Sequence, residues 1–147
     1  MGQPGDGQKP DLHIEATSCH PAAADGQWLV AWRIHNLADQ EMDILSVWLP
    51  HDKFLSSQLT LDPVMRLLPE EDAILEVDVT CHEPPGSLVD NVYIILRLLW
   101  LEQTWRVFAR HRVKIDAGGK PHPICEVVSM HPVGFSEGSR SDSAPAG

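Results

Sequence analysis

Apolar and polar residues alternate along five separate stretches of this chain. In residues 92–100, every even-numbered position from Val92 to Trp100 is apolar, and in residues 105–115 the odd-numbered positions are apolar except for His111. A period of two residues is typical of a β-strand with one buried face. The stretches that show it are residues 12–17, 28–35, 75–81, 92–100 and 105–115.

Turn-forming residues separate these stretches at intervals of roughly ten residues, a spacing typical of sandwiches and barrels. Two further runs, residues 42–49 and 58–61, end at Pro50 and shortly before Pro63. The link at residues 101–103 is short enough for a hairpin, which makes the last two long strands antiparallel neighbours. Residues 124–130 could add an edge strand, and a helical interpretation fits only residues 64–68.

The pattern resembles an immunoglobulin-like (Ig-like) β-sandwich over about residues 11–116. The features that carry the resemblance are a Trp-bearing second strand ending in Asn36, the turn at residues 69–72 and the closing hairpin. The chain departs from antibody-type domains because it lacks their paired cysteines with an intervening Trp, since Cys19 and Cys81 lie on other strands than the pair does in those domains. The resemblance implies an all-β, two-sheet sandwich of about seven antiparallel strands, a bacterial-style module whose fold fixes no function.

The length of 147 residues predicts a single domain. We expect a flexible leader at residues 1–10, the sandwich at residues 11–135 and a disordered tail at residues 136–147. The net charge of −10 argues against nucleic-acid binding, and no apolar run is long enough for a membrane-spanning helix. Three cysteines without a CxxC pair favour a reducing, cytoplasmic location over a disulfide framework.

No catalytic motif is present in the sequence. The chain contains no GxSxG, HExxH, phosphate-loop or dinucleotide-binding pattern, and its eight histidines are scattered. The sequence therefore predicts a protein that is not an enzyme and needs no cofactor.

Two Cys-His dipeptides are the best candidates for metal ligation. Thiolate and imidazole together suit zinc, and Cys19-His20 and Cys81-His82 each close a strand. In an Ig-like order these two strand ends fall at the same end of the sandwich. Adjacent residues on a strand point to opposite faces, however, and Cys81 continues the apolar phase of its strand. We therefore expect core thiols, with a zinc site as the alternative.

The outward side of the last two long strands is unusually apolar and basic for a solvent-exposed surface. If the third strand joins this sheet with Leu45, Val47 and Leu49 inward, then Ile44 and Trp48 also point outward. Aromatic and Arg side chains together are typical of protein interfaces. We call this surface the hairpin face and define it by Trp48, Tyr93, Ile95, Arg97, Leu99, Arg106, Phe108, Arg110 and Arg112.

The hairpin face predicts a non-enzymatic module that binds a protein partner or itself, with a two-fold homodimer as the simplest assembly. Two other interpretations remain open. The face could be satisfied within the chain, either because residues 124–130 cover it or because its arginines pair with local Asp and Glu. Alternatively, the face could bind a small anion. A different class of function, a small metal- or ligand-binding protein, would use Cys19, His20, Cys81 and His82.

Overall fold

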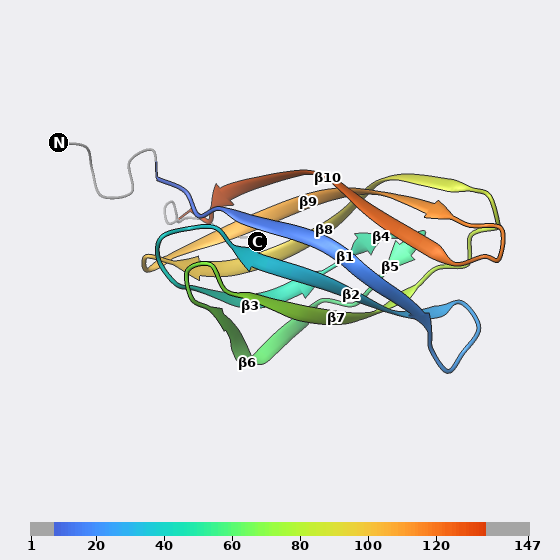
Figure 1. The fold of residues 1–147 in the computed structure, drawn as a ribbon, viewed down its shortest axis with the longest axis horizontal. Coiled ribbons are helices and arrows are strands. Elements are labelled where there is room, and N and C mark those ends of the chain that lie inside the picture. The colour runs from blue at the N-terminus through green and yellow to red at the C-terminus, as the bar shows by residue number, and fades with distance from the viewer. Residues whose placement is uncertain (1–7, 135–147) are drawn as a thin grey trace.

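The structure is a computed structural model and describes residues 8–134 (Figure 1). Every regular element in this part of the chain is a β-strand. The strands are β1 (Leu12–Pro21), β2 (Gln27–Asn36), β3 (Met42–Trp48), β4 (Pro50–His51), β5 (Phe54–Leu55), β6 (Leu59–Leu67), β7 (Asp72–Thr80), β8 (Leu88–Trp100), β9 (Gln103–Ile115) and β10 (Pro121–Pro132).

The strands form two five-stranded antiparallel sheets that pack face to face (Figure 1). The first sheet has the order β1-β2-β7-β5-β4, and the second has the order β10-β9-β8-β3-β6. The predicted all-β, two-sheet sandwich is therefore confirmed. The short β4–β5 hairpin was not predicted, because each of its strands has two residues and no period can be read from them.

The core lies between the sheets and is built from the inward residue of each alternating pair. From β8, Val92, Ile94, Leu96 and Leu98 are all buried, as the period of two predicts. Trp32 of β2 and Phe54 of β5 are the largest fully buried side chains. Full burial of a large apolar side chain stabilises a fold by roughly 1.5–3 kcal/mol, so this alternation is what fixes the pairing of the strands.

A hydrogen bond between buried side chains crosses the core from one sheet to the other. The indole Nε1 of Trp32 in β2 donates to Nε2 of His111 in β9 at 3.1 Å. The other ring nitrogen of His111, Nδ1, lies 2.9 Å from the carbonyl oxygen of Ala109 and must donate to it, because that oxygen can only accept. His111 is thus held as a neutral imidazole, and burial lowers its pKa.

Residues 64–68, where a helix was compatible with the sequence, do not form one. Residues 64–67 belong to β6, in which Met65, Arg66 and Leu67 pair with Ile44, Asp43 and Met42 of β3. The segment follows Pro63 and precedes Pro69, and it is too short for a stable isolated helix. Pairing with β3 satisfies its backbone groups instead.

The β8–β9 hairpin confirms the predicted antiparallel link. Its two turn residues, Leu101 and Glu102, have φ angles of 50° and 62°. Positive φ at both positions gives the turn a twist that matches the strands it joins, although Asn and Gly adopt it more readily. This turn sets the register in which Ile95 lies opposite Phe108 and Arg97 opposite Arg106.

Both outer strands of the second sheet contain proline. Pro63 lies in β6, and Pro121, Pro123 and Pro132 lie in β10. Proline has no N–H to donate, so within a sheet it is confined to edge strands with its nitrogen toward the free side. The strand β1 of the first sheet lies beside β10 without pairing to it (Figure 1).

The predicted leader and tail lie mostly outside the described residues. Of the leader, residues 8–10 are described, and Pro10 is buried. The backbone is anchored next to it, because the N–H of Leu37 donates to the carbonyl of Asp11 at 2.9 Å. The last described residues, 133 and 134, follow β10, and Val133 donates its N–H to Thr104.

Candidate functional site: the hairpin face

The hairpin face lies on the outer side of the second sheet, across β3, β8 and β9. Strand alternation places its side chains opposite the core residues of the same strands, so the predicted phase of β8 and β9 is correct. Arg97, Arg106 and Arg112 are exposed, whereas Tyr93, Ile95, Phe108 and Arg110 are partly exposed. The structure thus brings all nine predicted residues together on one sheet surface.

An apolar strip crosses this face from strand to strand. Trp48 of β3 lies opposite Ile95 of β8, and Ile95 lies opposite Phe108 of β9. The rings of Tyr93 and Phe108 meet edge to face with centroids 6.3 Å apart. Trp48 is 39% exposed, and Ile95 and Phe108 are partly exposed, so the strip is accessible to solvent.

The expected orientation of β3 is wrong at its start. Ile44 was expected to point outward beside Trp48, but it is buried, and Leu45 is partly exposed. A register shift between Ile44 and Ser46 is the physical cause, because an extra residue in one strand reverses its inward and outward positions from that point. Trp48 lies beyond the shift and points outward as predicted.

Residues 124–130 do not fold over the hairpin face. They pair with β9 as part of β10 and extend the second sheet sideways (Figure 1). The predicted edge strand is therefore present, and the predicted covering segment is not. The sheet extension adds Val127 opposite Arg110, Ser129 opposite Phe108 and His131 opposite Arg106. The alternation of residues 127, 129 and 131 could have identified these additions in the sequence.

Two of the four arginines on the hairpin face are already paired with acidic residues. Nε of Arg112 lies 3.0 Å from Oδ1 of Asp90 in β8 and 3.5 Å from Oε2 of Glu126 in β10. Nε of Arg110 lies 3.8 Å from Oε1 of Glu126. The expectation of local charge pairing therefore holds for this half of the face. Asp90 and Glu126 were not singled out in the sequence, because their place beside these arginines depends on register.

The other two arginines lie directly opposite each other. Arg97 of β8 pairs across the ladder with Arg106 of β9. Neither side chain forms an ion pair or hydrogen bond with another of residues 8–134. Their remaining neighbours in the same row are Ser46 of β3 and His131 of β10. The exposed face thus carries two uncompensated guanidinium groups beside its apolar strip.

A hollow that Leu99 of this face helps to line is not suited to an anion. A depression of about 440 Å³ lies at the end of the sheet, next to Leu99. It is lined by Glu41, Asp43 and Glu102, and its single arginine, Arg66, already binds Asp43 with an Nε–Oδ1 distance of 2.8 Å. Its negative lining would repel a small anion.

The two Cys-His dipeptides lie on neighbouring strand ends of the first sheet, because β1 and β7 flank β2 and run parallel to each other. Cys19 and Cys81 are buried in the core, while His20 and His82 are exposed. Each pair is split between the two faces, as adjacency on a strand requires. Among residues 8–134, no group of three or more His, Cys, Asp or Glu residues is placed to hold a metal ion.

Burial also makes the two thiols poor nucleophiles and poor metal ligands. It raises the pKa of Cys19 to about 11 and raises the pKa of Cys81. The thiolate is the form that attacks electrophiles and binds metals, so both side chains remain protonated at neutral pH. Their position is that of small apolar core residues.

Comparison with known proteins places no family on this chain. No protein-family model matches it, and no curated protein is found as a relative. Residues 8–134 contain no helix, and therefore none of the length and apolarity needed to cross a membrane.

Proposed function

We propose that this chain is a non-enzymatic, Ig-like interaction module that binds a protein partner, or itself, through the hairpin face. The observation that carries the proposal is the partly exposed apolar strip of Trp48, Ile95 and Phe108, which lies beside exposed arginines. Soluble monomers rarely leave such a contiguous apolar surface in water. Trp, Tyr and Arg are the residues that most often supply the binding energy of interfaces.

The strand order supports the Ig-like part of the proposal. Strands β1, β2 and β7 form one layer, and β3, β8 and β9 form the centre of the other. Ig domains arrange their first, second and fifth strands against their third, sixth and seventh in the same way. The three cysteines are all free thiols, which supports the cytoplasmic location inferred from the sequence.

The arrangement of the face supports a role in binding rather than in catalysis. Its apolar strip supplies area that can be removed from water, and its arginines can orient a partner through carboxylate pairs. Its nine residues include no Asp, Glu, His, Cys, Ser or Lys, the side chains that most often act as acid, base or nucleophile. The alternative based on Cys19, His20, Cys81 and His82 has no comparable support, because the thiols face the core and the imidazoles face solvent.

The test replaces the centre of the apolar strip with charge. We expect Ile95→Asp combined with Phe108→Asp to leave the β-sheet circular dichroism spectrum intact, because neither side chain is in the core. Self-association in sedimentation equilibrium, or partner capture from native extract, should be lost, since central apolar anchors contribute about 2 kcal/mol or more each.

The matched control is Ile74→Asp. Ile74 is 49% exposed on β7, at the outer surface of the other sheet, and its replacement should change neither association nor folding. Unfolding of the double variant would show that the face is buried within the full chain. A wild-type protein that is monomeric and captures nothing would contradict the proposal directly.

A further inference from the structure

We propose that the partner of the hairpin face is an acidic protein segment whose carboxylates bind Arg97 and Arg106 while an adjacent apolar side chain packs on Ile95 and Phe108. This inference rests on the proposed function and adds the chemistry of the partner. It comes from a difference among the arginines of the molecule. Of the six arginines in residues 8–134, the four that form ion pairs are Arg33, Arg66, Arg110 and Arg112.

The two arginines without a carboxylate are the two that oppose each other. Like charges at directly opposite positions of a sheet destabilise it, because their Cβ atoms are only about 4.5–5.5 Å apart. The chain has 21 acidic residues against 11 basic ones, so acidic residues are plentiful. An uncompensated pair in such a chain is an arrangement that binding of an anion would stabilise.

The surroundings of the arginine pair favour a carboxylate on a protein over other anions. On the same face of the sheet, the next pair on one side is Ile95 and Phe108, and on the other side it is Leu99 and Thr104. An anion bound at the arginines therefore has apolar surface next to it, which a peptide can cover with a neighbouring side chain. Nucleic acid presents a continuous polyanion, which the net charge of −10 repels.

Charge also disfavours a second copy of this chain as the partner. The outward side of β9 carries, in order, Arg106, Phe108, Arg110, Arg112 and Lys114. A two-fold contact of the hairpin face with itself would place these basic rows against each other. Of these basic residues, only Arg110 and Arg112 are ion-paired with carboxylates of the same chain. An acidic surface on another protein matches the face without this repulsion.

The probe is a displayed library of short random peptides, selected on the immobilised full chain. We expect the enriched peptides to carry two or more Asp or Glu residues next to Phe, Leu, Ile or Val. Fluorescence polarisation with the synthesised peptides should then show affinity about tenfold weaker, or more, for Arg97→Glu and for Arg106→Glu. Each variant should remain folded, because its new carboxylate lies opposite the remaining arginine.

The matched control is Arg33→Glu. This arginine is also an exposed strand residue, but it lies on the outer surface of the first sheet, so its reversal should not change peptide affinity. Enrichment of neutral or basic peptides would overturn the inference, and so would acidic peptides that bind Arg97→Glu as tightly as wild type.

The double variant Ile95→Asp with Phe108→Asp separates this inference from the proposed function. Peptides that lose binding to the double variant but are insensitive to both arginine reversals would leave the interaction face standing and refute the acidic partner. Self-association that Ile95→Asp with Phe108→Asp abolishes, and that is tighter than any peptide, would identify a second copy as the occupant and refute it too. A selection without any enriched peptide would count against both proposals.

Discussion

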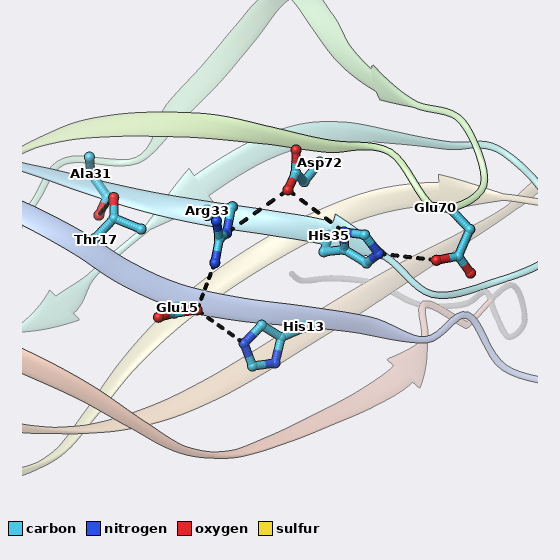
Figure 2. A network of polar contacts seen from close by, with 8 residues as sticks. All are labelled: His13, Glu15, Thr17, Ala31, Arg33, His35, Glu70 and Asp72. Atoms are coloured by element: carbon cyan, nitrogen blue, oxygen red, sulfur yellow. Dashed lines mark hydrogen bonds and ion pairs between the residues drawn. The ribbon is translucent and has the colours of Figure 1, made fainter.

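The two outer surfaces of the sandwich differ in the ion pairing of their arginines. On the first sheet, Arg33 lies between two carboxylates, with Nη2 3.2 Å from Oε1 of Glu15 and Nε 3.9 Å from Oδ2 of Asp72 (Figure 2). His35 extends the same network, with Nε2 3.3 Å from Oε1 of Glu70. We call these residues the ion-paired face. On the hairpin face, Arg97 and Arg106 have no such partners among the described residues.

The two surfaces therefore differ in whether all of their arginines have ion-pair partners within residues 8–134. The hairpin face is built on the three central strands of its sheet, and the ion-paired face is built on β1, β2 and β7 of the other sheet; both present exposed Arg side chains. The ion-paired face balances its arginine with carboxylates near the ends of neighbouring strands, and Leu55 and Ile74 are the large hydrophobic residues exposed on the strands of its sheet. The hairpin face combines an apolar strip with unbalanced charge. Among the described residues, the outer surface of the first sheet also carries unpaired charges, but these are the carboxylates of Glu76 and Asp78 in β7, whereas the unpaired charges of the hairpin face are guanidinium groups.

The largest expected effect comes from breaking the hydrogen bond that joins the two sheets beneath these faces. His111→Leu leaves the indole N–H of Trp32 buried without an acceptor, which should lower the free energy of unfolding by about 1–3 kcal/mol. Trp32→Phe should also destabilise, and the double variant should be more stable than the two single losses added together. Urea denaturation of the four proteins measures this, and simple additivity would show that the bond does not couple the sheets.

Acidification should act on the same bond with a smaller effect. Burial lowers the pKa of His111, so the folded state binds this proton less readily than the unfolded chain does. Its contribution to stability is therefore complete above about pH 6.5 and is lost as the pH falls toward the lower folded pKa. We expect a loss of up to about 1.4 kcal/mol per pH unit. Urea midpoints in that range should show it, and Trp32→Phe with His111→Leu should lack this component.

The smallest effects should come from removing single arginines on the two faces. The free energy of unfolding should fall for the arginine of the ion-paired face and should not fall for the arginine of the hairpin face. Arg33→Ala removes the centre of the ion-paired network and should destabilise by about 0.2–1 kcal/mol, with less effect at high salt. Arg97→Ala removes a like-charge contact and should leave stability unchanged or slightly higher. Thermal melts at low and high salt compare the two variants. Equal losses from both would remove the distinction between the faces.

Sequence reasoning could predict whatever depends on a period of two, and it failed where the strand is irregular. The phase of β8 and β9 follows from uninterrupted alternation, so the hairpin face could be assembled from the sequence. The orientation of Ile44 could not, because a shift of one residue in β3 leaves no local signal. The helical interpretation of residues 64–68 failed for a related reason, since only pairing with β3 decides the state of so short a segment.

The charge partners on the hairpin face were beyond prediction for a different reason. Whether an arginine is compensated depends on which residues two neighbouring strands place beside it. Glu126 reaches Arg110 and Arg112 only through the register of β10, which itself shifts between Cys125 and Val127. The position of Arg97 opposite Arg106 likewise depends on the hairpin register, which the turn at Leu101 and Glu102 sets.

The prolines at the margins of the second sheet oppose its extension by another chain. A partner cannot lengthen the sheet by adding strands at β6 or β10 in an open-ended series, because several of the required N–H donors do not exist. The margins of the second sheet are therefore protected against the addition of further strands, which is the step by which sheets aggregate edge to edge.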